Sequence, residues 1–252
     1  MYMPRLNLNK GAYKGELTDI DSILANCTRL AQQNGWEIEK IVAAPDIELL
    51  VLKKIVSQTA KNFYISSGIH GDEPAGPRAV ERLLEKNQWP ADANIYLLPC
   101  VNPTGARLHT RENKDKVDLN RDYLDPKTAE TIAHTKWLDL QPDFFRSMNV
   151  HEDWEANGFY IYGSNKDNAH KVVEAVRKVF PIETGPEADG MPVINGVMDV
   201  KFDGAKLPFW PEAFYLYLKK KSENYTLEAS SDYPMEERVN ALVTGVETLL
   251  HI

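Results

Sequence analysis

Residues 62–86, NFYISSGIHGDEPAGPRAVERLLEK, decide the fold of this chain. Residues 62–67 contain the apolar run Phe63, Tyr64 and Ile65 and lead into turn residues, which is typical of a buried strand. After the polar turn HGDEPAGPR, apolar residues recur at helical spacing, at Ala79, Val80, Leu83 and Leu84. Ligands normally bind at the ends of the strands in an open α/β sheet, so strand, turn and helix in this order predict a functional site at the turn.

Strands and helices alternate on both sides of this stretch. Periodicity and turn residues predict helices at residues 19–34, 76–86, 127–140, 168–179, 212–220 and 235–250. They predict strands at 36–43, 48–56, 62–67, 94–99, 144–150, 159–162 and 224–229. Residues 102–125 show no periodicity and are expected to form a long loop, and a Gly- and Pro-rich region spans 181–211. We therefore expect one α/β domain over residues 1–252, with three α/β/α layers and a mixed, mostly parallel central sheet.

The composition excludes several classes of protein. A formal charge of -8 argues against a broad nucleic-acid surface, and the basic run at residues 219–221 is interpreted as a solvated helix end. No apolar stretch approaches the roughly 20 residues that a membrane span needs, and the opening residues lack the apolar core of a secretion signal. Cys27 and Cys100 are expected to be packed thiols in a reducing cytoplasm.

The turn after the predicted strand at 62–67 carries candidate metal ligands. His70 and Glu73 are three residues apart and can converge on one ion, and zinc accepts N and O donors at roughly 2.0–2.2 Å. A catalytic zinc needs a third protein ligand and an open position for water. His151 follows the apolar run 144–150, so it is also expected at a strand end. His-x-x-Glu alone is common, and a lone His151 would be read as a capping or solvated histidine.

Further motifs lie between and after these residues. They are NPTG at 102–105, TREN at 110–113, VDLNRD at 117–122 and YTLE at 225–228. In this order, across about residues 65–229, the set resembles the zinc carboxypeptidase family, in particular its small bacterial members that resemble murein peptide amidases. The resemblance implies a zinc carboxypeptidase-like fold and a Zn²⁺ ion bound by His70, Glu73 and His151.

The resemblance also implies roles for residues around the metal. Glu228 would be the general base that takes a proton from the activated water, and Arg111 would stabilise the oxyanion. Asn120 and Arg121 would bind the carboxylate at the end of the substrate, which suits the planar fork of an arginine. Asp118 would orient His70. As an alternative, the two arginines could simply pair with carboxylates of this charged loop.

The sequence does not decide which residues form the substrate pocket. Family members place a mobile tyrosine over the substrate, and no motif chooses between Tyr215, Tyr217 and Tyr225. Asp122 stands where members often carry a second asparagine. His109 could touch substrate or be a plain loop residue, and His134, His170 and His251 are interpreted as surface or packing residues. A second metal bound by Asp72, Glu152 and Asp153 is a minor alternative.

The predicted function is a zinc-dependent metallopeptidase that hydrolyses a peptide or amide bond next to a free carboxylate. The first alternative is an N-acyl amino acid hydrolase resembling aspartoacylase or succinylglutamate desuccinylase, which shares His-x-x-Glu, Asp-Leu-Asn-Arg and a later histidine. The NPTG and TREN elements favour the peptidase. A catalytically inactive metal-binding protein of the same fold is the second alternative. Nickel, cobalt or manganese could occupy the same donors, and the substrate and oligomeric state stay open.

Overall fold

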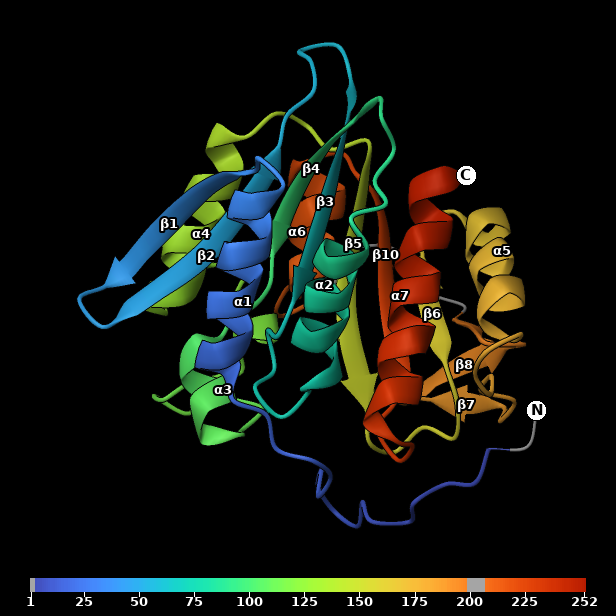
Figure 1. Cartoon of the computed structure of the whole chain (residues 1–252). Coiled ribbons are helices and arrows are strands. Elements are labelled where there is room, and N and C mark those ends of the chain that lie inside the picture. The colour runs from blue at the N-terminus through green and yellow to red at the C-terminus, as the bar shows by residue number, and fades with distance from the viewer. Residues whose placement is uncertain (1–2, 199–206) are drawn as a thin grey trace.

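A ten-stranded mixed sheet runs through the centre of the molecule (Figure 1). The computed structural model describes residues 3–198 and 207–252. The strands are β1 (Glu37–Ala44), β2 (Ile47–Lys54), β3 (Lys61–Ser67), β4 (Ala93–Leu98), β5 (Arg146–Asp153), β6 (Tyr160–Gly163), β7 (Glu187–Ala188), β8 (Met191–Ile194), β9 (Val197–Met198) and β10 (Glu223–Ser230). Their order across the sheet is β1-β2-β4-β3-β5-β10-β6-β9-β8-β7.

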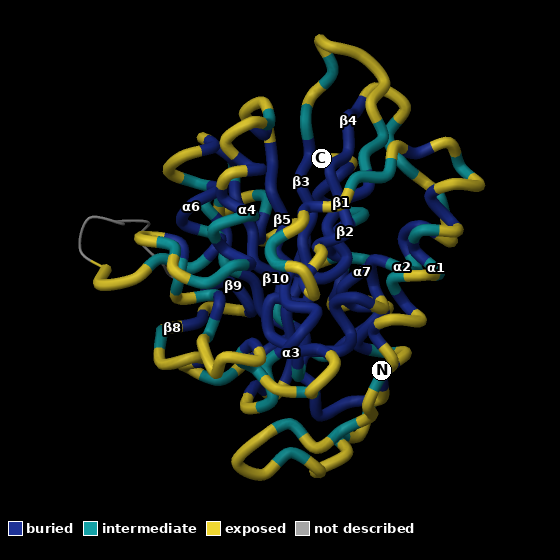
Figure 2. Tube along the Cα trace, turned by 90° about the vertical axis from the view of Figure 1, so that its left-hand side faces the viewer, coloured by how far each residue is buried: buried dark blue, intermediate teal, exposed yellow. Residues whose placement is uncertain are grey.

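The centre of the sheet is parallel and its flanks are largely antiparallel. Strands β4, β3, β5 and β10 run in one direction, and the next strands on either side, β2 and β6, pair antiparallel with this centre. The expected mixed sheet is therefore confirmed, with its parallel part concentrated in the middle. Figure 2 shows these central strands as the most deeply buried part of the chain, as expected for a parallel sheet covered on both faces.

Helices cover both faces of the sheet and complete three layers (Figure 1). The helices are α1 (Ile20–Gln33), α2 (Ala75–Lys86), α3 (Pro103–Leu108), α4 (Ala129–Leu140), α5 (Lys166–Val176), α6 (Glu212–Lys219) and α7 (Met235–His251). The apolar faces of α1, α2, α5 and α7 pack in one hydrophobic cluster, and those of α4 and α6 pack in a second cluster on the opposite face. The predicted three-layer α/β/α architecture is confirmed.

The structure corrects the expected loop at residues 102–125. It contains the helix α3 and a 3₁₀ turn at Leu119–Arg121. The Asn102 side chain caps α3 by accepting a hydrogen bond from the N–H of Gly105 (2.8 Å), and Pro103 occupies the first turn. A helix of six residues is too short to show the periodicity on which the sequence prediction relied.

Two further differences concern strands. β5 does not end at residue 150 but continues to Asp153, so His151 lies inside the strand. The Gly- and Pro-rich region contributes the short strands β7, β8 and β9, whereas its residues 199–206 lie outside the described part of the chain. The predicted helix at 212–220 and the predicted strand at 224–229 agree with α6 and β10 to within one residue at each end.

Both cysteines are packed in the interior, as expected. Cys27 and Cys100 are buried and form no disulfide. Burial raises the pKa of the Cys100 thiol to about 12, so this side chain stays neutral. Among the described residues, each helix is either too short or too polar to cross a lipid bilayer.

A buried polar network lies between the sheet and the helices α4 and α6. The Glu212 carboxylate accepts hydrogen bonds from the Tyr64 hydroxyl (2.7 Å) and from the Ser66 hydroxyl (3.0 Å). His134 bridges the hydroxyls of Tyr64 (3.0 Å) and Tyr123 (2.7 Å), consistent with the packing role expected for this histidine. Burial raises the pKa of Glu212 to about 7, although the two hydroxyl groups oppose this shift.

The Glu212 network predicts a specific dependence of stability on pH. Between about pH 5 and pH 7 the unfolded chain has already released this proton whereas the folded chain still holds it, so stability falls as the pH rises. In Glu212→Gln this contribution is absent. We expect urea unfolding at about pH 5 and pH 8 to show that the variant gains up to about 3 kcal/mol relative to the wild type at the higher pH.

The matched control is Glu174→Gln, which changes an exposed carboxylate on α5. Its stability relative to the wild type should stay nearly constant between the two pH values. A constant difference for Glu212→Gln as well would contradict the assignment.

Candidate metal centre and active site

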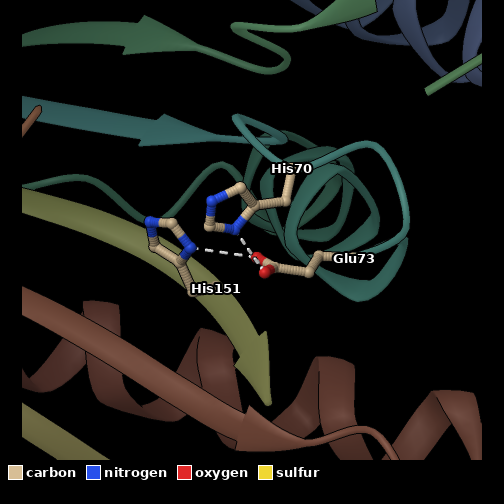
Figure 3. A group of neighbouring side chains, drawn as sticks. All are labelled: His70, Glu73 and His151. Carbon is tan, nitrogen blue, oxygen red and sulfur yellow. Dashed lines mark hydrogen bonds and ion pairs between the residues drawn. The ribbon is translucent and has the colours of Figure 1, made fainter. Parts of the chain in front are cut away.

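Three buried side chains meet at the end of the parallel strands (Figure 3). His70 and Glu73 lie on the turn between β3 and α2, and His151 lies on the neighbouring strand β5. Strands β3 and β5 pair in register up to Ser67 and Val150, so the residues that follow on the two strands face each other. The structure thus brings together the three residues predicted as metal ligands.

The turn that carries His70 and Glu73 packs closely on the backbone of α3. A Cβ atom on Gly71 would lie 2.0 Å from the carbonyl carbon of Gly105, so a side chain at residue 71 would displace the turn. The NPTG motif therefore has a structural role, because its Asn102 caps α3 and its Gly105 meets the ligand-bearing turn.

Two histidine nitrogens point at the two oxygens of one carboxylate. Nδ1 of His70 lies 2.5 Å from Oε1 of Glu73, and Nδ1 of His151 lies 2.9 Å from Oε2. All three donor atoms lie within 4.8 Å of one another. Two imidazole nitrogens and one carboxylate oxygen form the set of three protein ligands that catalytic zinc sites use, so these residues fit a zinc ion.

The same residues have strongly shifted proton affinities. Burial would raise the pKa of Glu73, but the two adjacent histidines hold it far below its ordinary value. Burial alone lowers the pKa of His70, but Glu73 and Asp118 raise it to about 9. For His151 the effect of burial prevails over the attraction of Glu73, and its pKa falls below the ordinary value. The pocket therefore concentrates negative charge on Glu73 and favours a cation beside it.

Asp118 links a candidate ligand to Arg111. Its Oδ1 lies 3.3 Å from Nε2 of His70, at ion-pair distance but without hydrogen-bond geometry, and its Oδ2 accepts a hydrogen bond from Nε of Arg111 (3.0 Å). Nη1 of Arg111 lies 3.8 Å from Oε1 of Glu73. Arg111 thus pairs with one carboxylate of its own loop, as the alternative expected for it, and its contact with Glu73 places it beside the candidate ligands.

The contacts of Asn120 and Arg121 are with the neighbouring loop and the segment that leads into α6. The Asn120 side chain accepts a hydrogen bond from the N–H of Glu212 (3.0 Å), which ties it to the start of α6. Arg121 is exposed, and its guanidinium carbon lies 5.0 Å from the centre of the Phe209 ring. Asp122 accepts hydrogen bonds from residues 127, 128 and 131 and so fixes the start of α4. Asp122 therefore has a structural role.

Glu228 lies beside the candidate ligand His151, on the adjacent strand. It pairs with His151 in the parallel register of β10 and β5, which places both side chains on one face of the sheet. Burial and the neighbouring Glu73 raise the pKa of Glu228 well above its ordinary value, whereas Arg111 lowers it. A bound divalent cation would also favour the ionised form.

Two tyrosines near Glu228 were missed by the sequence reasoning. Tyr160 is the cross-strand partner of Glu228 on β6, and Tyr162 lies on the same face two residues further. Tyr160 donates a hydrogen bond to Asp153 (2.9 Å), and Tyr162 donates one to Asp189 (2.8 Å). Their sequence signal is only an alternating pattern, which cannot reveal the register with β10.

The three tyrosines considered from the sequence contact other parts of the molecule. Tyr215 donates to Asp139 on α4, and Tyr225 donates to Glu223 at the start of β10. Tyr217 lines a surface pocket with Ser164 and Lys221. The hydrogen-bond partners of Tyr215 and Tyr225 are therefore not candidate ligands. His109 is the C-cap of α3, in a left-handed conformation.

Two of the three residues considered for a second metal are engaged elsewhere, whereas Oδ1 of the third, Asp72, is buried without a hydrogen-bond partner among the described residues. Glu152 forms an ion pair with Arg238 (2.5 Å), and Asp153 accepts a hydrogen bond from Tyr160. Within residues 3–198 and 207–252, His70, Glu73 and His151 are the only group of three or more potential ligands close enough to share an ion.

Comparisons with known proteins support both resemblances. Residues 59–155 match the model of the succinylglutamate desuccinylase/aspartoacylase catalytic domain. Over 114 residues the chain is 32% identical to carboxypeptidase SOL1 of Arabidopsis thaliana, a match that covers 35% of this chain and 22% of that protein. The chain thus spans less than a quarter of the curated relative that it matches.

Solved structures share the fold over nearly the whole chain. A candidate metallopeptidase from Shewanella amazonensis SB2B superposes with a TM-score of 0.80 at 22% identity, over 98% of this chain and 96% of that chain. A metallo-carboxypeptidase from Burkholderia cenocepacia gives 0.71 at 15% identity, over 93% and 69%. A metallo-carboxypeptidase from Pseudomonas aeruginosa in complex with (2-guanidinoethylmercapto)succinic acid gives 0.68 at 18% identity, over 90% and 67%. The fold is that of the metallocarboxypeptidases.

The ligand set predicts one zinc ion per chain. We expect equilibrium dialysis with metal analysis to find about one equivalent of Zn²⁺ on the wild type. Loss of a residue that only hydrogen bonds to a metal ligand weakens metal binding by up to about a hundredfold. His70→Ala removes one of the three ligands themselves, so it should weaken zinc binding by more than this. His170→Ala, an exposed histidine on α5, is the matched control and should retain the metal. Equal zinc affinity in both variants would refute the site.

Proposed function

We propose that this protein is a zinc-dependent hydrolase that cleaves a peptide or amide bond next to a free carboxylate, in the manner of a metallocarboxypeptidase. The observation that carries the proposal is the convergence of His70, Glu73 and His151 with Glu228 on one face of the sheet and with Arg111 beside them. The fold shared with metallo-carboxypeptidases supports it.

Each residue has a chemical task in this proposal. Zn²⁺ held by His70, Glu73 and His151 would lower the pKa of water and polarise the scissile carbonyl. Glu228, on the strand next to His151, takes a proton from the attacking water. Arg111, held by Asp118, donates hydrogen bonds to the oxygen on which negative charge develops.

The substrate carboxylate is assigned to the exposed guanidinium of Arg121. Arg121 can form paired hydrogen bonds with a carboxylate, and its partner Asn120 is fixed by the start of α6. The neighbour from Pseudomonas aeruginosa is in complex with a succinic acid derivative, which carries carboxylates of the kind proposed here.

A second candidate function is hydrolysis of an N-acyl amino acid. It is favoured by the match of residues 59–155 to the succinylglutamate desuccinylase/aspartoacylase domain, a range that includes the three ligands and Arg121 but not Glu228. Turnover of dipeptides measured beside turnover of N-acetyl and N-succinyl amino acids distinguishes the two. Metal binding without turnover of either class would favour an inactive protein.

Glu228→Gln tests the general base. The amide cannot take a proton, so we expect kcat to fall by about 10²- to 10⁴-fold while bound zinc stays near the wild-type level. Steady-state kinetics and metal analysis on the same preparation provide both values. Glu174→Gln makes the same chemical change on the exposed face of α5 and should leave kcat unchanged. Wild-type turnover in Glu228→Gln would rule out this role.

Arg121→Met tests recognition of the carboxylate. Losing a charged hydrogen-bond pair should raise KM about ten- to a hundredfold with little change in kcat. A substrate whose terminal carboxylate is replaced by an amide should be equally poor for the wild type and the variant. If the variant and the wild type differ as much on the amide as on the acid, Arg121 does not bind the carboxylate.

A further inference from the structure

A buried ion pair lies next to the candidate metal centre, at the residue that follows His151 on β5. The proposed chemistry gives this pair no role. Nη1 of Arg238, on α7, lies 2.5 Å from Oε1 of Glu152, and both side chains are only 1% exposed. Glu152 is the residue that follows His151 on β5. Figure 1 shows the start of α7 beside the end of β5. Removing two charges from water is unfavourable unless they are paired and hydrogen bonded, so this pair holds two elements in a fixed relation.

Glu152 connects the two segments that carry the ligands. Its Oε2 accepts a hydrogen bond from the N–H of Ala75 (2.6 Å), which is the first residue of α2 and lies two residues after Glu73. Its own N–H donates to Oε2 of Glu73 (3.2 Å), the oxygen that also faces Nδ1 of His151. One residue therefore joins the turn of His70 and Glu73 to the strand of His151.

Arg238 connects Glu152 to α7, the helix that follows the strand of Glu228. It lies in the first turn of α7, and its N–H donates to the carbonyl of Pro234 (3.2 Å). Its side chain also contacts Tyr13 of the N-terminal segment, with the hydroxyl 3.4 Å from Nη1 and from Nη2 and the ring centre 5.6 Å from the guanidinium carbon. Arg238 is thus enclosed between Glu152 and Tyr13.

We propose that Arg238 and Glu152 are positioning residues of the metal centre. The pair fixes the distance between the Glu73 carboxylate and His151, and so sets the affinity and geometry with which the three ligands hold a metal ion. The inference rests on the proposed metal site, but it does not depend on which bond the enzyme cleaves. A purely structural pair would contribute to stability alone.

A second ion pair with a buried arginine supplies a control. Arg146, 2% exposed, lies at the start of the same strand β5, and its Nη2 is 2.7 Å from Oε1 of Glu223. Arg146 is thus buried almost as deeply as Arg238, whereas its partner Glu223 is 26% exposed. This pair sits at the end of β5 opposite to His151. Arg146→Met and Arg238→Met each replace a buried arginine that pairs with a carboxylate, so both variants should lose stability in urea unfolding.

Metal binding separates the two variants. For Arg238→Met we expect the Kd for Zn²⁺, measured by competition with a chelator, to rise about ten- to a hundredfold. The visible absorption bands of the Co²⁺-loaded protein should shift, because they depend on ligand geometry. Arg146→Met should keep the wild-type Kd and the wild-type Co²⁺ spectrum. Glu152→Gln keeps an acceptor for the N–H of Ala75 but loses the negative charge, so its Kd for Zn²⁺ should rise by less than that of Arg238→Met. This variant still tests the inference if Arg238→Met does not fold.

The outcomes distinguish the inference from the metal site itself. Wild-type Kd and spectrum in folded Arg238→Met or Glu152→Gln would overturn the positioning role and leave the metal site intact. An equal loss of affinity in Arg146→Met would also overturn it, because general destabilisation would then explain the result. A wild type that binds neither Zn²⁺ nor Co²⁺ would refute the metal site and this inference together, whereas a wild type that binds metal without turnover would refute only the proposed hydrolysis.

Discussion

The Glu73 carboxylate, buried between His70 and His151, is the constraint on which the rest of this site depends. Each of its oxygens faces one imidazole nitrogen, at 2.5 Å and 2.9 Å. A buried carboxylate is costly unless every oxygen is paired, so the turn after β3 and the end of β5 must remain in register. The close contact of Gly71 with α3 and the hydrogen bonds of Glu152 both serve that register.

The interior beneath the metal centre is polar along one face of the sheet. Asn149 lies two residues before His151 on β5, donates a hydrogen bond to Ser66 on β3 (3.0 Å) and accepts one from Asn224 on β10 (2.8 Å). Ser66 in turn donates to Glu212. These hydrogen bonds fix the positions of the side chains beneath the candidate ligands, whereas an apolar layer would leave those positions less strictly specified.

The sequence predicted the parts of the site that follow from local pattern. The strand, turn and helix around His70 and Glu73 are encoded within residues 62–86. His151 could be expected at the same edge of the sheet because it follows the apolar run 144–150. The sequence could not predict Tyr160 beside Glu228, because the pairing of β6 with β10 depends on register across the sheet. Nor could it predict the contact of Arg238 with Glu152, since the two residues are 86 positions apart and no local pattern connects them.

Asp118 couples metal binding to oxyanion stabilisation in the proposed chemistry. One of its oxygens lies beside His70 and the other holds Nε of Arg111 (3.0 Å), so the ligand and the arginine are oriented by the same carboxylate. A donor that is already fixed needs no reorganisation when charge develops on the substrate oxygen. Peptide and N-acyl substrates develop the same charge at the same place. Both substrate classes also carry a carboxylate next to the scissile amide, which the exposed Arg121 would bind in the same way. The part that differs is the acyl group on the other side of the bond, so the distinction between them lies in the residues that would contact that acyl group.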